Sequence, residues 1–256
     1  MIAENLKQVL SELPEKVRLV AVSKFHPNEA IEEAYRAGQR VFGESKVQEM
    51  TAKYESLPKD IEWHFIGHLQ TNKIKYIVPY VALIHGIDSY KLLAEVNKQA
   101  AKAGKTVNCL LQLHIAREET KFGFSFDECR EMLAAGEWRK LNHIRICGLM
   151  GMATNTDNDE QIKTEFCSLS SFFNEVKAKW FADAEHGRDL PAARADGVPL
   201  SPCPDAQRRS CGGADAGDVL SGRAHCRAVP RRRKTHHMAL RYCKERPAHL
   251  SAPSSG

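Results

Sequence analysis

Short apolar runs alternate with amphipathic segments along residues 1–184, and this alternation limits the fold more than any other feature of the chain. Six pairs of a strand-like run and a helix-like segment occur, at about 30 residues each, which is the expected size of a βαβ step. Strict alternation predicts a parallel α/β sheet covered by helices. A TIM-type barrel of eight units and an open doubly wound sheet both remain open, but no Gly-x-Gly-x-x-Gly follows the first run, which weighs against a dinucleotide fold.

The boundaries of the elements follow from apolar periodicity and from capping residues. We expect strands at 17–24, 40–43, 61–67, 81–87, 107–115 and 144–150. We expect helices at 1–16 (stopped by Pro14), 27–37, 46–57, 89–103, 126–135 and 157–180, with a short one opening at 71–73. Ser45 and Asp88 are the expected N-caps, and Gly38, Gly104 and Gly136 the expected C-terminal stops.

The first run, residues 17–24, reads as a buried strand that ends at a lysine, and Pro27 then fits the first turn of a helix. Ligands of parallel α/β folds bind at the C-terminal ends of strands. Lys24 is therefore the main candidate for function, with a solvated lysine at a strand exit as the alternative. A lysine can form a Schiff base only when its amine is neutral. Desolvation inside the mouth of a barrel favours the neutral form of the amine.

The composition changes abruptly after Ala184. Residues 185–256 contain 11 of the 18 Arg, 7 of the 11 Pro and 4 of the 8 Cys, but no Ile, Phe, Trp or Asn. They carry 13 Lys and Arg against 7 Asp and Glu, whereas residues 1–184 carry 24 against 25. The basic run at 231–234 has no interleaved aromatic residues and no recognisable module around it, so we expect no nucleic-acid partner.

This second segment shows no apolar period, and its composition is that of a GC-rich gene read out of frame. We hypothesise a frameshift near codon 184, which would leave 1–184 as an incomplete barrel domain and 185–256 as a disordered tail. Translating the gene in its other two frames tests this hypothesis. If neither frame offers two more strand–helix units, the hypothesis is wrong.

The chain carries no sign of export or of a membrane segment. The first ten residues are amphipathic rather than apolar, and no apolar run approaches the roughly 20 residues of a membrane span. The cysteines form no repeated Cys-x-x-Cys pairs and no zinc-ligand spacing. We expect a soluble cytoplasmic protein with no membrane partner and no metal.

Five motifs resemble one known family in order and spacing. They are Val-Ala-Val-Ser-Lys at 20–24, Phe-Gly-Glu at 42–44, Trp-His-Phe-Ile-Gly-His-Leu-Gln-Thr-Asn-Lys at 63–73, Thr-Lys-Phe-Gly-Phe at 120–124 and Gly-Leu-Met-Gly-Met-Ala at 148–153. Together they resemble the pyridoxal phosphate homeostasis protein family over about residues 1–184. The resemblance implies a monomeric barrel like the N-terminal domain of alanine racemase. Such a protein holds pyridoxal 5′-phosphate (PLP) without turnover of its own, and PLP-dependent apo-enzymes are its candidate partners.

The resemblance also assigns roles to single residues. It makes Lys24 the lysine that forms the internal aldimine with PLP. Ser45 stands where the family usually has Asn, at a cofactor-side hydrogen bond. His64 and His68 flank the end of a strand, and this position, apart from the resemblance, predicts either a polar wall over the cofactor or a structural role in shaping the loop. Met150 would line the barrel mouth or the core.

Two other functions stay open. A PLP-dependent amino-acid enzyme such as a racemase needs a second acid or base on the opposite face of the cofactor, and related racemases take it from a second domain and the partner subunit. The other possibility is a non-functional frameshifted remnant. The family's phosphate-binding segments, Ser-x-Gly-Met-Ser and Gly-Ser-Thr-x-Val-Arg-x-Gly, do not occur after Ala184, so no phosphate-binding residue can be assigned. We therefore expect weaker PLP binding and poorer folding than in an intact relative.

Overall fold

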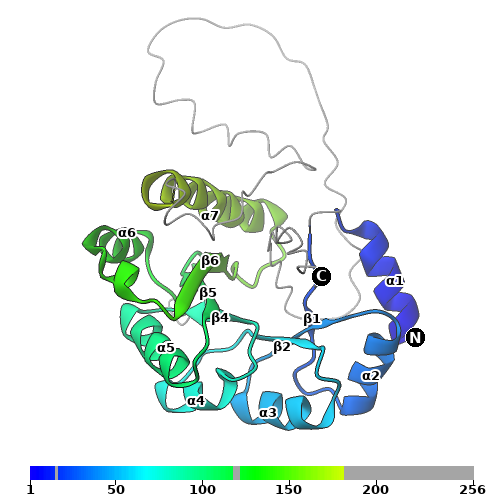
Figure 1. Cartoon of the computed structure of the whole chain (residues 1–256). Coiled ribbons are helices and arrows are strands. Elements are labelled where there is room, and N and C mark those ends of the chain that lie inside the picture. The colour runs from blue at the N-terminus through cyan, green and yellow to red at the C-terminus, as the bar shows by residue number, and fades with distance from the viewer. Residues whose placement is uncertain (15–16, 118–121, 182–256) are drawn as a thin grey trace, which may run out of the picture. The chain divides into compact units, whose positions relative to one another are not determined.

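Strands and helices alternate throughout the part of the chain that the computed structural model describes, residues 1–14, 17–117 and 122–181 (Figure 1). The elements are α1 (Ile2–Glu12), β1 (Ala21–Val22), α2 (Asn28–Arg36), β2 (Val41–Glu44), α3 (Val47–Ser56), β3 (Glu62–Phe65), the 3₁₀ helix η1 (Thr71–Lys73), α4 (Ile74–Ile77), β4 (Leu83–Ile87), α5 (Tyr90–Lys102), β5 (Val107–Leu113), α6 (Phe126–Ala135), the 3₁₀ helix η2 (Glu137–Lys140), β6 (Ile144–Gly151) and α7 (Asp159–Trp180). The predicted order of six strand–helix units is confirmed.

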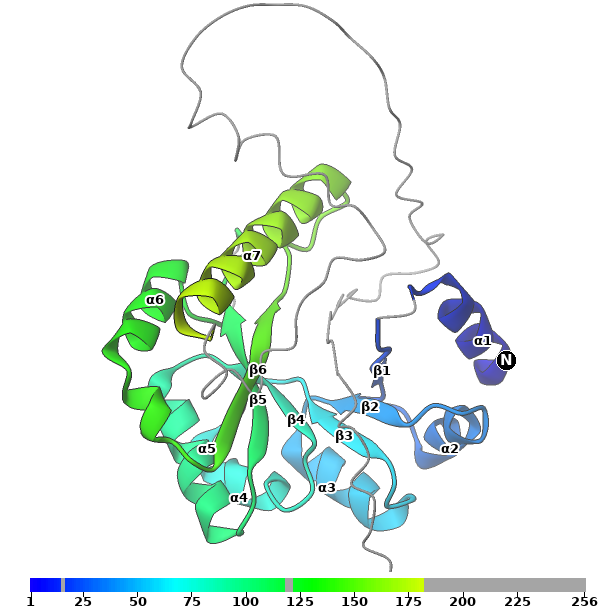
Figure 2. The same cartoon turned by 45° about the horizontal axis from the view of Figure 1, so that its top comes forward.

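The described strands form one six-stranded sheet in the order β1-β2-β3-β4-β5-β6, and every pair is parallel. Each strand therefore lies beside its neighbour in sequence, with the helices along the outer side of the sheet (Figure 2). This is the winding of a barrel, because a doubly wound sheet reverses its strand order at a switch point. The predicted frameshifted tail at 185–256, where two further units of a barrel are expected to be missing, lies outside the described residues.

The first strand differs from its prediction. We expected a buried strand over 17–24, but β1 contains 2 residues, and Val22 within it is 40 % exposed. The reason is pairing, because among the described residues β1 has only β2 as a neighbour. A strand that is paired on one side, with one face open to solvent, does not acquire the burial that its apolar composition suggests.

Two of the expected helix caps are also wrong. The N-cap of α3 is Lys46 rather than Ser45, and no side chain bonds to the helix N-terminus there. The N-cap of α5 is Ser89 rather than Asp88, and its hydroxyl accepts a hydrogen bond from the Leu92 N–H. Gly136 is confirmed as the C-terminal stop of α6, with a left-handed φ of 74°.

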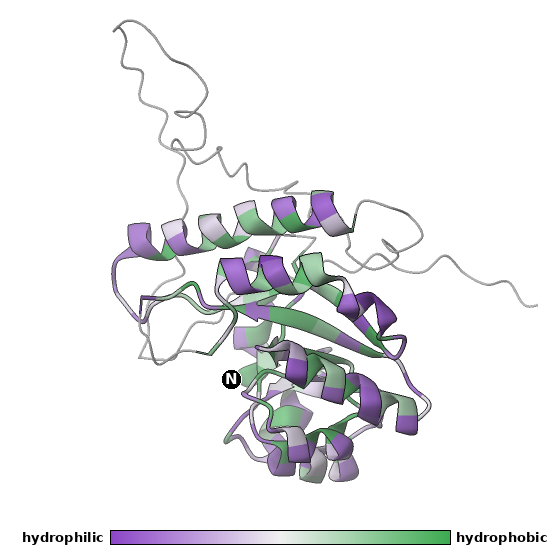
Figure 3. Cartoon of the chain, turned by 90° about the vertical axis from the view of Figure 1, so that its left-hand side faces the viewer, coloured by the Kyte–Doolittle hydropathy of each residue, from purple (hydrophilic) through white to green (hydrophobic). Residues whose placement is uncertain are grey.

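The two sides of the sheet are packed differently. Trp63 and Phe65 on β3 join the large apolar cluster between the strands and the helices. The other side carries a smaller apolar cluster of Leu83, Leu110, Cys147 and Met150. Since successive strand residues point to opposite faces, His64 is directed to this inner side. Figure 3 shows that the strands are mainly hydrophobic, whereas the helices that cover them carry both hydrophilic and hydrophobic residues.

Within the described residues, no helix is long and apolar enough to cross a membrane. The same part of the chain holds no group of three or more His, Cys, Asp or Glu side chains that could bind a metal ion. Cys109, Cys129 and Cys167 take part in no disulfide among the described residues. Burial raises the pKa of the Cys109 thiol strongly and that of Cys129 to about 12, so both behave as core residues rather than nucleophiles.

Candidate functional site

Lys24 lies immediately beyond the C-terminal end of β1, in a turn that leads to α2. Its side chain is half-buried. The Ser23 N–H still donates to the Gly43 carbonyl at 3.0 Å, so the pairing of β1 with β2 continues up to the lysine. By strand alternation, Lys24 is expected on the open inner side with Val22, whereas Ser23 faces the helices.

A buried network of polar side chains lies behind this turn, between the sheet and α3. Glu44 has no exposed surface, and the Lys53 side chain is 7 % exposed. The Lys53 ammonium donates to the Ser23 carbonyl at 2.8 Å and to Oε1 of Glu44 and of Glu49 at 2.7 Å each. The Ser23 hydroxyl also donates to Glu44 Oε1, at 2.7 Å. Buried charges need such partners, because an unpaired one costs several kcal/mol.

Phe25 completes the turn in an uncommon backbone conformation. It has a φ of 66°, the only positive φ of a non-glycine residue in the described chain, and its side chain is 72 % exposed. Its N–H donates to Glu49 Oε1 at 2.7 Å. Burial alone would raise the pKa of the Glu49 carboxyl, but the hydrogen bonds from Lys53 and from the Phe25 N–H outweigh it and lower that pKa.

Sequence analysis missed Lys53 and Glu49. Their spacing of four residues on one helix indicates an ion pair. It does not indicate that the pair turns inward, because a charge pair on a helix is usually solvated. The clue is in the structure of β2, whose last residue, Glu44, is fully buried and faces α3.

The inner side of the sheet carries two buried histidines, and His64 is one of them. His64 is 2 % exposed and His85 has no exposed surface. His85 Nε2 lies 3.0 Å from His64 Nδ1. Burial, and then the neighbouring His64, place the pKa of His85 well below its ordinary value, so its ring is neutral at physiological pH. His64 is therefore part of a buried pair on the inner side.

The backbone after β2 and the backbone after β3 make unusually close contact. Ser45 is half-buried there, and a Cβ built on Gly67 would collide with the Ser45 carbonyl oxygen. A Cβ on Gly86 would in turn come within 2.7 Å of the Gly67 carbonyl oxygen. The backbones of three neighbouring strands thus lie very close together near their C-terminal ends, and the glycines leave the room for this contact.

Met150 lies on the inner side at 2 % exposure, so its position agrees with both of its predicted roles, core or mouth lining. It pairs in register with Gln112 of β5, whose side-chain amide donates to the Phe122 carbonyl at 2.9 Å. Lys24, Ser45, His64 and Met150 thus come from β1, β2, β3 and β6 or from the residues that follow them.

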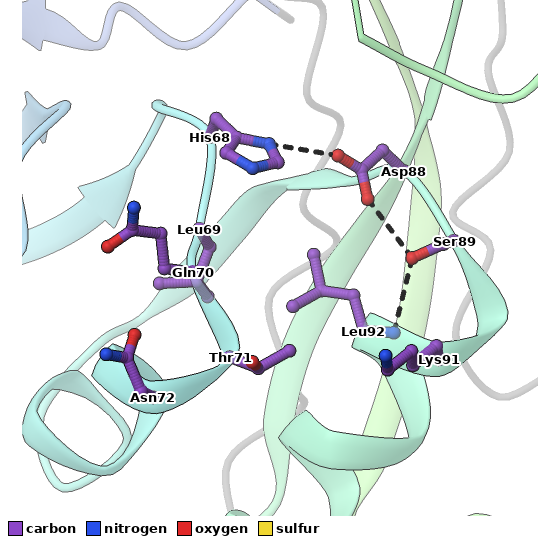
Figure 4. Close-up of a pocket in the computed structure, with 9 residues that line it drawn as sticks. All are labelled: His68, Leu69, Gln70, Thr71, Asn72, Asp88, Ser89, Lys91 and Leu92. Carbon is purple, nitrogen blue, oxygen red and sulfur yellow. Dashed lines mark hydrogen bonds and ion pairs between the residues drawn. The ribbon is translucent and has the colours of Figure 1, made fainter.

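A pocket of roughly 430 Å³ lies between the chain after β3 and the start of α5 (Figure 4). It is lined by His68, Leu69, Gln70, Thr71, Asn72, Asp88, Ser89, Lys91 and Leu92. His68 Nδ1 contacts Asp88 Oδ2 at 3.1 Å, and the His68 ring stacks on Phe122 with centroids 4.2 Å apart. Lys24, Ser45, His64 and Met150 do not line this pocket. The recess in Figure 4 is therefore lined by a different set of residues from the predicted cofactor residues.

Comparisons with known proteins agree with this fold. The family model described as alanine racemase, N-terminal domain, matches residues 1–185. The pyridoxal phosphate homeostasis protein of Aquifex aeolicus is 36 % identical over 171 residues, which cover 66 % of this chain and 74 % of the relative. Its counterpart from Synechocystis is 38 % identical over 200 residues, covering 75 % and 91 %.

One of the similar solved structures contains bound PLP. PipY of Synechococcus elongatus, in a structure with PLP bound, is 35 % identical and superposes with a TM-score of 0.64, covering 70 % of this chain and 84 % of PipY. The alanine racemase of Clostridium difficile, at 14 % identity and a TM-score of 0.58, shares the fold.

The sequentially wound parallel sheet and the match over residues 1–185 place the chain in the fold class of the alanine racemase N-terminal domain. Within that class, the chain belongs to the pyridoxal phosphate homeostasis protein family.

Proposed function

We propose that this protein holds PLP reversibly on Lys24 and thereby serves PLP homeostasis in the cytoplasm, as a monomer that passes the cofactor to PLP-dependent apo-enzymes. The observation that carries the proposal is the position of Lys24, half-buried at the C-terminal end of β1. That end of a parallel strand is where ligands of this fold class bind. PipY, the relative with PLP bound, supports the same cofactor.

The residues present fit the aldehyde end of PLP. When bound, PLP supplies an aldehyde carbon that condenses with a primary amine and releases water. The part of this chain is to present the Lys24 amine on the inner side of β1, where the neighbouring Val22 supplies an exposed apolar surface. The phosphate end has no assigned residues, since the family's phosphate motifs do not occur in the sequence.

Ser45, His64 and Met150 remain proposed cofactor contacts. Ser45 follows β2, the only described neighbour of β1, so its hydroxyl is the polar group best placed by topology to reach a ligand on Lys24. His64 and Met150 are buried on the inner side. Their contribution would be the shape of the surface beneath the cofactor, because both side chains are shielded from solvent.

A PLP titration followed by near-ultraviolet and visible absorbance tests this proposal. We expect a saturable band of the lysine-bound cofactor in the wild-type chain, no band in Lys24→Ala, and a retained band in Lys91→Ala. Lys91 is the matched control because it is the one lysine that lines the pocket of Figure 4. A band that survives in Lys24→Ala and disappears in Lys91→Ala would move the site to that pocket. The absence of any band in the wild type would refute PLP binding by this chain.

A further inference from the structure

The two peptide groups that flank Lys24 are each held by a side chain of α3. On the N-terminal side, the Ser23 carbonyl accepts a hydrogen bond from Lys53 at 2.8 Å. On the C-terminal side, the Phe25 N–H donates to Glu49 at 2.7 Å. Lys53 and Glu49 are also bonded to each other at 2.7 Å. The Glu49–Lys53 ion pair thus holds the peptide groups on both sides of the proposed cofactor lysine, and we call this arrangement the bracket.

This bracket lies behind the turn rather than in the site. Glu44, which anchors Lys53 from β2, is fully buried between the sheet and α3. An ammonium has three donors, and those of Lys53 are all used, by Ser23, Glu44 and Glu49. Lys24 is expected on the opposite side of the sheet, so the bracket acts on its backbone and not on its amine.

The turn has a reason to need holding. A bulky residue at a φ of 66° is in a sparsely populated region of backbone space, and such a conformation persists only where the surroundings impose it. The Phe25 ring is 72 % exposed, so apolar burial contributes little to fixing it. The turn is closed by the His26 N–H, which donates to the Ser23 carbonyl at 3.0 Å, and the Lys46 ammonium lies 5.1 Å from the centroid of the Phe25 ring. The Phe25 N–H contact with Glu49 is the restraint that acts directly on the peptide group between Lys24 and Phe25.

We propose that Glu49 and Lys53 are positioning residues for Lys24: they hold its two flanking peptide groups so that its amine is presented to PLP. This inference rests on the proposed function and deepens it. A positioning role differs from the general stabilising effect of an ion pair. It predicts that the loss of the Glu49 contact matters for PLP binding only while residue 25 is strained.

A double-mutant cycle tests this coupling. Glu49→Ala removes the acceptor of the Phe25 N–H, and Phe25→Gly removes the strain, since glycine adopts a positive φ without steric cost. We expect Glu49→Ala to weaken PLP binding roughly tenfold when residue 25 is Phe. A factor of this size corresponds to the free-energy cost of one strained backbone conformation. In the Phe25→Gly background we expect the same change to cost less than about threefold.

Glu175→Ala is the matched control. Glu175 also accepts hydrogen bonds from a cation on a neighbouring helix, Arg130 at 2.8 Å, but it lies on α7. We expect Glu175→Ala to lower the melting temperature comparably and to leave the dissociation constant of PLP within about twofold of the wild type. Equal weakening of PLP binding by Glu49→Ala and Glu175→Ala would overturn the positioning role.

Amide hydrogen exchange at residue 25 gives a second readout that needs no cofactor. We expect slow exchange in the wild type and at least about tenfold faster exchange in Glu49→Ala, with amides of β5 unchanged. If the wild type fails to bind PLP, the proposed function fails, and this arm still decides whether the bracket exists. Unchanged exchange at Phe25, or faster exchange with PLP affinity unaltered, would overturn the inference.

Discussion

The first and last strands of the described sheet are held in different ways. β6 has 8 residues and pairs with β5 from Ile144 to Gly151 with one shift of register, and α7 packs against it. β1 has 2 residues, pairs only with β2 among the described strands, and leaves Val22 40 % exposed. Beyond Ser23, a backbone hydrogen bond from His26 to Ser23 and side-chain hydrogen bonds from α3 hold the chain in place of strand pairing. The candidate lysine therefore lies at the end of the sheet with the least strand pairing, and we propose that its position depends on Lys53 and Glu49.

The largest effect should come from removing Lys53. Lys53→Met leaves the fully buried Glu44 carboxylate without its cation, and we expect the free energy of unfolding to fall by about 3–5 kcal/mol. Urea denaturation measures this loss. The double variant Lys53→Met/Glu44→Gln, which also removes the buried charge, should recover part of it. If the single and double variants were equally unstable, the stabilising effect would come from the stem of the lysine and not from the pairing of charge.

A core substitution at the other end of the sheet provides the contrast. Leu111 on β5 has no exposed surface and is paired on both sides, with Ile87 and with Leu149. Leu111→Ala should lower the free energy of unfolding by about 3 kcal/mol through loss of burial and a residual cavity. We expect this variant, when still folded, to keep the wild-type exchange rate at the Phe25 amide. Faster exchange there would mean that the two ends of the sheet are one cooperative unit.

The first and last strands of the sheet also differ in how well the sequence predicts the structure around them. Periodicity and capping residues predicted α6, Phe126–Ala135, with its stop at Gly136, because both signals are local. Lys24 was selected as the candidate because it follows an apolar run and precedes Pro27, and its role stays a prediction. The length of β1 was overestimated, since pairing depends on a distant neighbour. The inward turn of Lys53 could not be predicted, because it depends on Glu44, a residue on another element.

The smallest effect concerns pH. Hydrogen bonds hold the pKa of Glu49 below its ordinary 4.5, against the opposing effect of burial, so the carboxylate contact is fully present above that pH. As the pH falls below about 4.5 and through the lowered pKa of the folded state, Glu49 gains a proton and its hold on the Phe25 N–H weakens. The stabilising contribution is therefore lost on the acid side.

We expect the protection factor of the Phe25 amide to fall in that acid range, while that of the Phe124 amide stays constant. Phe124 donates to the Gln112 carbonyl at 2.8 Å, an acceptor without a titratable proton, which makes it the matched reference. Glu49→Gln should abolish the pH dependence at Phe25, because an amide accepts the same bond at every pH. Parallel loss of protection at both amides, or an unchanged acid loss in Glu49→Gln, would assign the effect to general acid unfolding. The lysine turn would then depend on the sheet as a whole and not on its own carboxylate.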